Sequence, residues 1–392
     1  MNEAHHPGPE PEHEHDWNPR SAAVFDDQIA AYDGMRRRCP VARSEYLHWS
    51  LFHHADVSRA LHDHTSFSNA VSSHLSVPNG MDPPEHTPFR QIIDPYFDPS
   101  AMASFKPACE SIARNLVHTL DQGPVDIMEQ LAHPYALEAQ CAFMGWPATL
   151  HQPLRDWMRK NHKATLSANR AAMDQIAHEF DGYMLALINE RRQPGPNVPD
   201  DTTARLAREQ VDGQPLSDEA LISILRNWTV GELGTIAASV GILVHYLATH
   251  PALQEQLRKQ PELLSPAIDE ILRIHPPLIA NRRITTRPVE LGGRHLDAGE
   301  RVSILWASAN RDAAIFGDPD GFRLDRDPSL NLLYGAGIHA CPGAPLARLE
   351  LETIIRALLM ATREIQPVPE THLVPAAYPT GGYRQVPLHI LR

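Results

Sequence analysis

The ten residues Tyr334–Gly343, YGAGIHACPG, combine one cysteine with three glycines and a histidine. Two kinds of chemistry use such a stretch. The letters GAGIHA fit the dinucleotide-binding fingerprint G-x-G-x-x-A, whose glycines let a pyrophosphate approach the backbone. The same residues also fit a loop that presents the thiolate of Cys341 to a metal-bearing cofactor. The rest of the chain has to show whether the loop binds a dinucleotide or presents a thiolate to a cofactor.

The segments on either side of this loop argue against dinucleotide binding. That fingerprint requires a strand before it and a βαβ unit around it. Here a proline-containing irregular segment precedes the glycines, and only about 50 residues follow them. Too little chain remains for the further strands that such a sheet needs.

The sequence after Cys341, PGAPLARLELETIIRALLMA, has the apolar spacing of a long helix. Pro342 and Pro345 are tolerated only in a first turn, so Cys341 is predicted at the helix N-terminus. Free amides and the helix dipole stabilise a thiolate there, while Gly335 and Gly337 allow a tight turn and close approach to a flat ligand. These conditions suit a cysteine-ligated haem iron; the alternative is a buried structural cysteine in a capping loop.

Helical spacing dominates the chain from Ala22 to about Leu257. Examples are DDQIAAYDGMRRR and SIARNLVHTLDQ, with apolar residues three and four positions apart. One alternating run near Tyr46, YLHWSLF, interrupts this pattern and predicts a strand.

The longest helical pattern covers residues 217–250, with Ser217 as its predicted N-cap. A helix of about 30 residues is about 45 Å long and has to cross the whole molecule. After Arg283 the pattern changes to short strands and turns, until the final helix begins. We therefore expect a mainly α fold with small β-sheets, in which a flexible tail (1–20) precedes one large domain (21–392).

Composition and charge exclude several classes of protein. Acidic residues exceed basic ones by 48 to 35, a formal charge of −13, whereas nucleic-acid binders are usually basic. The four cysteines form no C-x-x-C pair, so neither a zinc site nor an iron–sulfur cluster is predicted. No run reaches the roughly 18–20 apolar residues that span a bilayer, and the N-terminus lacks the apolar stretch of a signal peptide. The sequence predicts a cytoplasmic protein without nucleic-acid or membrane partners.

Three further motifs accompany the cysteine loop in order along the chain. Asp82–Arg90, DPPEHTPFR, fits a cofactor-gripping helix, Glu270–Arg273 fits E-x-x-R, and Asn310–Asp312, with FGDPDGFRLDR soon after, fits a meander. The loop itself fits F-G-x-G-x-H-x-C-x-G, with Tyr334 in place of phenylalanine. Together these motifs make the chain resemble the bacterial members of the cytochrome P450 superfamily over nearly its whole length. The resemblance implies the cytochrome P450 fold and a haem domain.

The resemblance also implies roles for individual residues. Cys341 is expected to be the axial ligand of the haem iron. Glu270 and Arg273 lie three apart on one helix face, and with Arg326 they are expected to form a buried network that holds the cysteine loop, in place of an exposed surface pair. The expected haem contacts are Tyr334, Gly335 and four propionate-binding side chains, namely His86, Arg90, His339 and Arg283 (or the adjacent Arg282).

The long helix departs from the family pattern A-G-x-D/E-T-T, whose acid and alcohol organise water and deliver protons. In Val230–Thr235, VGELGT, alignment on the first glycine puts Leu233 in place of the acid and Gly234 in place of the alcohol. Glu232 and Thr235 each lie one position away, about 100° around a helix. Three explanations are open: a π-bulge that rotates Thr235 or Glu232 into use, a water relay in the space beside Gly234, or turnover without the pair. Glu232 and Thr235 are the catalytic candidates, with the alternative that Glu232 faces another helix or solvent.

The resemblance implies a haem-thiolate monooxygenase that inserts one oxygen atom of O2 into a small organic substrate. The segments SVPNGMDPPEHT and RNWTVGELGT together resemble a branch often fused to a reductase that carries FMN and a 2Fe-2S cluster. Its members act mostly on small aromatic compounds, by hydroxylation or O-dealkylation. The implied partners are such a substrate, O2, and a ferredoxin or FMN/2Fe-2S reductase that passes electrons from NAD(P)H to haem b. The alternatives are a peroxide-driven peroxygenase and a haem sensor or carrier without turnover.

Two surfaces follow from the same resemblance. The residues expected to line the substrate pocket are Val230, Leu233, Gly234, Leu278 and Ile279, together with the loop 71–77 and the turn near Thr380. The cysteine side of the molecule is expected to carry a local basic patch for an acidic electron donor, formed by Arg90, Arg348 and Arg356.

Overall fold

The computed structural model describes residues 16–392 except 73, 168, 197, 372 and 377. Its helices are α1 (Ala22–Asp26), α2 (Gln28–Arg38), α3 (His54–His62), α4 (His86–Ile93), α5 (Pro99–Thr119), α6 (His133–Met144), α7 (His151–Ser167), α8 (Arg170–Arg191), α9 (Thr202–Leu206), α10 (Asp218–Thr249), α11 (Pro251–Lys259), α12 (Leu264–Ile274), α13 (Trp306–Ala309), α14 (Ala313–Phe316) and α15 (Ala344–Ala361). Its strands are β1 (Val41–Ser44), β2 (His48–Leu51), β3 (Phe67–Ser68), β4 (Gly123–Asp126), β5 (Gln210–Val211), β6 (Gln214–Pro215), β7 (Ala280–Thr285), β8 (Val289–Leu291), β9 (Arg294–Leu296), β10 (Arg301–Leu305), β11 (Glu364–Pro367), β12 (Val374–Pro375), β13 (Tyr383–Gln385) and β14 (Pro387–Leu391).

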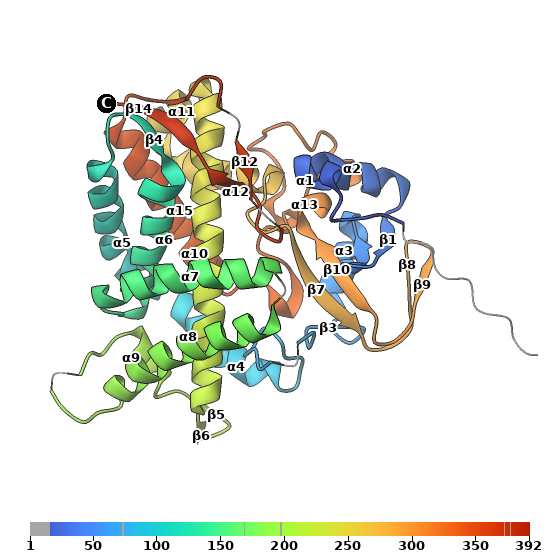
Figure 1. The fold of residues 1–392 in the computed structure, drawn as a ribbon, viewed down its shortest axis with the longest axis horizontal. Helices are drawn as coiled ribbons and strands as arrows, with labels where there is room; N and C mark the ends of the chain where they lie inside the picture. Colours follow the sequence, from blue (N-terminus) through green and yellow to red (C-terminus); the bar gives the residue numbers. More distant parts are fainter. Residues whose placement is uncertain (1–15, 73, 168, 197, 372, 377) are drawn as a thin grey trace, which may run out of the picture.

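The strands form small sheets beside a larger helical part. The largest sheet has the order β1-β2-β10-β7-β3, in which β10 runs parallel to β2 and the other neighbours are antiparallel. Its apolar side chains, among them Trp49, Leu51 and Ile304, share one buried cluster. A second sheet, β11-β14-β4, joins the C-terminus to the helical part. In Figure 1 the helices α5 and α6 lie to the left of α10, and the β7–β10 sheet lies to the right.

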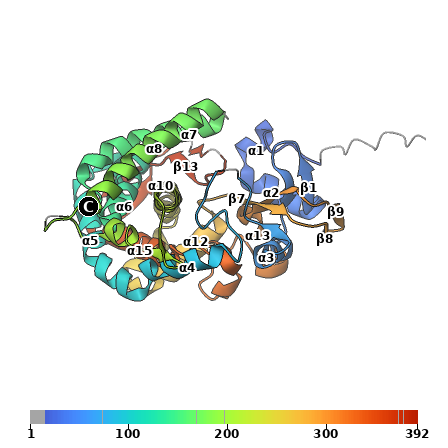
Figure 2. The same cartoon turned by 90° about the horizontal axis from the view of Figure 1, so that it is seen from below.

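Helix α10 crosses the molecule, upright in Figure 1 and close to end-on in Figure 2. Its N-terminus is capped by Ser217, whose hydroxyl accepts a hydrogen bond from the Ala220 amide at 3.2 Å, and two acidic residues in the first turn suit the helix dipole. In the described part of the chain it is the one helix long and apolar enough to cross a membrane. However, it packs against α6, α8, α12 and α15, so its apolar surface is explained by the protein core.

These elements confirm the main predictions from the sequence. The fold is mainly α with small sheets, and the long central helix and the final helix lie where the patterns placed them. Pro345 falls in the first turn of α15, as its missing amide requires. The alternating run near Tyr46 contains β2.

The prediction of a flexible tail is wrong for its last residues. Trp17 is only 7% exposed and packs edge-on against Tyr32 and Phe52. Asp16 accepts hydrogen bonds from the Arg43 amide and the Arg294 side chain, both at 2.7 Å. The free energy gained by burying a large aromatic ring holds this part of the N-terminal segment against the domain, although the residues around it are polar. Residues 1–15 lie outside the described residues, and the assignment of 21–392 to one domain stays a prediction.

Candidate active site

Cys341 lies in the loop just before α15, as predicted. Its amide donates to the Tyr334 carbonyl at 2.9 Å. Burial raises the pKa of its thiol, whereas the Gly343 and Ala344 amides, which point at the sulfur, lower this pKa. The side chain nevertheless has accessible surface, so it is open to a ligand. The described residues contain no cluster of three or more metal-ligating side chains, so the site offers one thiolate, as a haem iron requires.

The glycines of the loop serve different purposes. Gly335 and Gly337 both have positive φ, +70° and +68°, which favours glycine. A Cβ on Gly337 would lie 2.3 Å from the Leu61 carbonyl oxygen, so the close approach at this position is to the end of α3. The expectation that Gly337 makes room for a ligand is therefore wrong. Around Gly335 the nearest atom to such a Cβ is 3.9 Å away, and its contact with haem stays a prediction.

His86, His339 and Arg283 gather beside the loop. The two imidazole rings are 4.4 Å apart, and the Nε2 atom of each is buried without a hydrogen-bond partner among the described residues. Burial, and then the neighbouring His86 and Arg283, lowers the pKa of His339 to about 3. Burial lowers the pKa of the Arg283 guanidinium to about 10. The nearest acid, Asp82, is 3.8 Å from His339. The unpaired ring nitrogens beside the buried Arg283 guanidinium fit an anionic ligand such as the two propionates of a haem, whose charge would favour protonated imidazole rings.

Arg90 lies one turn after His86 on α4, and Pro88 falls in the first turn as predicted. Its Nη1 donates to the carbonyls of Ile338 at 3.2 Å and Ala340 at 2.9 Å, and its Nε donates to Asp94. Its Nη1 group therefore holds the cysteine loop. A contact of Arg90 with a propionate stays a prediction.

Tyr334, which replaces the usual phenylalanine, is held by two charged neighbours. The Arg348 guanidinium lies 4.4 Å from the ring centre and pairs with Asp269 at 3.0 Å. Burial, and then Asp269, raises the pKa of the phenol. The aromatic ring thus keeps its place behind the loop, and its hydroxyl faces a carboxylate.

The same ion pairs bear on the expected basic patch. Arg90 pairs with Asp94 at 2.8 Å, Arg348 with Asp269, and Arg356 with Glu352 at 2.6 Å. Each arginine of the patch therefore has an acidic partner within reach. The patch carries little surplus positive charge, because local acids offset it.

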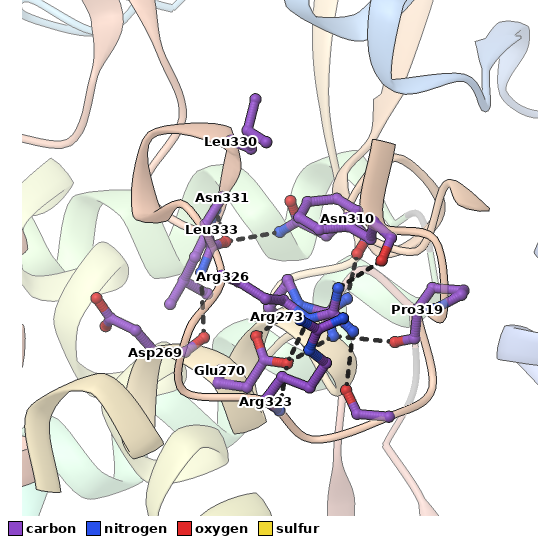
Figure 3. Close-up of polar contacts among 12 residues, drawn as sticks. Asp269, Glu270, Arg273, Asn310, Pro319, Arg323, Arg326, Leu330, Asn331 and Leu333 are labelled. Atoms are coloured by element: carbon purple, nitrogen blue, oxygen red, sulfur yellow. Dashed lines mark hydrogen bonds and ion pairs between the residues drawn. The ribbon is translucent and has the colours of Figure 1, made fainter. Parts of the chain in front are cut away.

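A buried network joins α12 to the segment that precedes the cysteine loop, and Figure 3 shows its side chains. Glu270 accepts bonds from Arg273 at 2.8 and 2.9 Å and from Arg326 at 2.9 Å. Arg273 also donates to the Asn310 carbonyl at 2.7 Å, and only 1% of its side chain is exposed. The predicted ion pair and the predicted third member, Arg326, are both confirmed.

Two asparagines carry this network to the loop. Asn310 donates to Asn331 at 3.1 Å and accepts the Leu332 amide at 2.8 Å. Asn331 in turn accepts the Leu333 amide and donates to the Asp269 carbonyl. These hydrogen bonds hold Leu332 and Leu333, which lead into Tyr334–Gly343, against the network (Figure 3). The E-x-x-R motif marked the start of this network and the meander motif included Asn310, but no sequence signal marked Asn331.

The middle of α10 has one open face in an otherwise buried stretch. Val230 is 42% exposed, and Gly231 next to it is exposed as well. Gly234 and Thr235 follow one turn later on the same face. The Thr235 hydroxyl donates to the Gly231 carbonyl. Helix α10 is an uninterrupted α-helix, so the π-bulge that the sequence left open is absent from it, and Thr235 reaches this face without one.

Other predicted pocket residues divide between core and open positions. Leu233 is buried in the main core cluster, and Ile279 packs in the cluster that contains Trp17 and Phe52. Leu278 is partly buried and forms a β-bridge with Thr380, so two predicted lining segments do lie together. The structure places Leu233 and Ile279 in the core and not on the open face; contact of any of these residues with a substrate stays a prediction.

The predicted lining loop 71–77 is fastened to α10. The Ser223 hydroxyl accepts the Val77 amide at 2.8 Å and donates to the Leu75 carbonyl at 3.0 Å. Asn227 donates to the Val77 carbonyl at 2.9 Å. The end of this loop is thereby held one to two turns before Val230, next to the open face.

Glu232 points away from solvent. Its carboxyl group meets that of Glu350, a fully buried residue of α15. Of the sequence alternatives, the one in which Glu232 faces another helix is therefore confirmed. Sequence reasoning missed Glu350; the available signal was an acid between Leu349 and Leu351 in an otherwise apolar helix stripe.

Comparison with known proteins agrees with this geometry. The family model described as Cytochrome P450 matches residues 148–374. Cyclomarin C epoxidase CymV of Salinispora arenicola is 31% identical over 83% of this chain and 86% of its own, and erythromycin C-12 hydroxylase of Saccharopolyspora erythraea is 30% identical over 83% and 84%. A mutant of P450 EryK in complex with erythromycin B superposes with a TM-score of 0.85 at 26% identity, over 94% of this chain and 97% of that one. CYP109E1 from Bacillus megaterium in complex with corticosterone gives a TM-score of 0.83 at 28% identity, over 94% and 99%.

Proposed function

This chain belongs to the cytochrome P450 family, and from that premise we propose that Cys341 is the axial thiolate of a haem b iron. A haem so ligated supplies the chemistry of O2 activation, which a thiolate ligand favours. The single observation that carries the proposal is the thiol of Cys341, which is accessible to a ligand and has two amides directed at its sulfur. Amides at a helix N-terminus stabilise the thiolate form that ligation needs.

The group of His86, His339 and Arg283 supports the placement of the propionates. We assign one or both of these carboxylates to these residues, because the Nε2 atoms of both histidines are buried without a partner among the described residues and Arg283 is buried beside them. Charge-assisted hydrogen bonds would then offset the desolvation of both partners. Tyr334 and Gly335 complete the cofactor side, and Arg90 keeps the loop in place.

The enzyme is a cytochrome P450 monooxygenase, whose overall reaction is RH + O2 + two electrons + two protons → ROH + H2O. We propose that the substrate is a small aromatic compound, which is hydroxylated or O-dealkylated. The support is the resemblance of SVPNGMDPPEHT and RNWTVGELGT to a branch with such activity. The relatives named above carry the names of erythromycin and cyclomarin chemistry, so the substrate screen has to include larger molecules as well.

Within this reaction we propose that Thr235 and Glu232 handle protons. Thr235 presents a hydroxyl on the open face of α10, and Glu232 lies one turn away. Val230, Gly234 and Leu278 are the proposed substrate contacts with open surface. Electrons are proposed to come from NAD(P)H through a ferredoxin or an FMN/2Fe-2S reductase, in the cytoplasm.

Two measurements test the proposal. Cys341→Ala should abolish the thiolate-type Soret shift of the reduced carbon monoxide complex and all O2-dependent product formation, and retention of both would refute it. Substrate-dependent NAD(P)H consumption with a reductase system, compared with turnover driven by hydrogen peroxide alone, separates a monooxygenase from a peroxygenase. A spin-state change of the haem, screened with small aromatics and with macrolides and steroids, identifies the substrate class.

A further inference from the structure

Glu232 of α10 and Glu350 of α15 form a pair of carboxyl groups inside the protein. The two helices pack against each other, and Glu350 has no exposed surface. The two groups approach within hydrogen-bonding reach of one another. Apart from this contact, Glu232 Oε1 and both carboxyl oxygens of Glu350 are buried without a hydrogen-bond partner in the described part of the chain.

The surroundings offer no cation to this pair. Neither carboxyl forms an ion pair with a described residue, whereas many surface acids do. The titratable groups that face the pair are Cys109 of α5, Tyr135 of α6 and, farther away, Cys341. The Tyr135 hydroxyl donates its hydrogen to the Glu350 backbone carbonyl at 2.7 Å. The hydroxyl oxygen lies 3.1 Å from the Cys109 sulfur. Among the described residues, the hydrogen available to either carboxyl is therefore one carried by the other.

Two ionised carboxylates cannot share such a site, because each lacks water and each repels the other. One of them has to keep a proton, which then bridges the pair. Burial, followed by the charge of Glu232, raises the pKa of Glu350 well above that of an ordinary glutamate. Carboxyl pairs with this arrangement hold one proton over a broad pH range.

The position of the pair relates it to the open face of α10. Glu232 lies three residues before Thr235, so the two side chains are neighbours on the helix. The charge of Glu232 also acts on Cys341, which places the pair close to the cofactor side. Leu233, in contrast, supplies no acidic group at the position where the family pattern led us to look for one.

We propose that Glu232 and Glu350 store one shared proton and release it toward Thr235 when O2 is reduced. In this step an O–H bond of the pair breaks and the proton ends in the water or alcohol product. A proton from solvent replaces it at the pair as it leaves, so the pair never carries two negative charges. The electrons come from the reductase and not from the pair. Glu350 acts through Glu232 and is a positioning residue. This inference rests on the function proposed above.

The first test is infrared difference spectroscopy of the haem-loaded protein near neutral pH. The parent should show the C=O stretch of a protonated carboxylic acid, shifted in D2O. The band of the shared proton should be lost in Glu232→Gln and in Glu350→Gln, because each variant removes one carboxyl of the pair, and a lone protonated carboxyl would absorb at a different frequency. It should persist in Glu352→Gln, the matched control on the partly exposed side of α15. A band that survives without a shift in both Glu232→Gln and Glu350→Gln would overturn the inference. Glutamine has the shape of a protonated glutamate, so we expect both variants to fold.

The second test measures product formed per NADH oxidised. General acid catalysis contributes about 10²-fold or more to a proton transfer, and since water can replace part of it, we expect roughly a tenfold loss in either glutamine variant. Hydrogen peroxide should account for the missing electrons, and Glu352→Gln should couple as well as the parent. Unchanged coupling in variants that have lost the infrared band would refute the role in turnover.

The two tests separate this inference from the proposed function. If the parent itself forms no product with any reductase, the monooxygenase proposal fails, whereas the infrared result still decides whether a proton is shared. If the parent forms product and retains the thiolate Soret shift but the band is absent, only the carboxyl pair is refuted.

Discussion

Replacement of Glu270 by alanine should destabilise the whole domain. It should also loosen the cysteine loop, so that thiolate ligation of the haem is lost more easily. Glu270 is the acceptor for Arg273, for Arg326 and, at 3.1 Å, for the Arg323 amide. Without it, the Arg273 guanidinium remains buried with only two carbonyl acceptors, those of Asn310 and Pro319. Removal of one partner of a buried ion pair costs about 3–5 kcal/mol, which is a large part of the roughly 5–15 kcal/mol that stabilises a typical domain.

The assay is urea denaturation followed by circular dichroism, together with the Soret band of the reduced carbon monoxide complex. The midpoint should fall by the equivalent of about 3–5 kcal/mol, and thiolate ligation should be lost at lower urea than global structure. Arg323→Ala is the matched control, because among the described residues its side chain pairs with the exposed Asp325 alone. This substitution should lower the free energy of unfolding by about 0–1 kcal/mol. In the double variant with Arg273→Leu, part of the stability should return, since the most deeply buried unpaired charge is then removed, while Arg326 keeps its carbonyl acceptors.

If Glu270→Ala lowers the free energy of unfolding by no more than the control does, this reasoning is refuted. It would mean that water or backbone carbonyls satisfy the buried arginine as well as the carboxylate does. Loss of stability with an intact thiolate spectrum would refute the second half alone, namely that this network holds the cysteine loop.

Three further predictions concern single side chains. His86→Ala should weaken haem binding by about 1–3 kcal/mol, as judged by haem transfer to apomyoglobin, because a propionate loses a buried donor; unchanged affinity would show that the propionates lie elsewhere. Thr235→Ala should divert electrons to hydrogen peroxide, whereas Thr249→Ala, which removes a similar helix hydroxyl, should not; equal coupling in both would remove Thr235 from proton delivery. Burial holds the pKa of His275 near 4, against about 6.5 in an unfolded chain. The unfolded state therefore binds more protons between these values, so stability should fall as pH drops from about 6.5 to 4, and His275→Gln should flatten this dependence by about 1–3 kcal/mol in thermal melts at graded pH; an unaltered pH profile would contradict the burial of this ring.

The sequence by itself determined the local features. Helical periodicity, the cap at Ser217 and the proline in the first turn of α15 depend on neighbours within a few residues, so their signals are written in short stretches. The placement of Cys341 at a helix N-terminus follows from the same local rules. The Glu270–Arg273 pair could be predicted too, because residues three apart on a helix are neighbours wherever the helix lies.

The tertiary structure alone decided which distant groups meet. Glu232 and Glu350 are 118 residues apart in the sequence. In the sequence each is typical of a charged helix residue, and only the packing of α10 on α15 brings them together. The docking of Trp17 on Tyr32 and Phe52 likewise overrode the polar composition of the N-terminal segment. Burial and the absence of a counter-charge are properties of the packed surroundings, and these properties, rather than residue type, determine whether a carboxyl group keeps its proton.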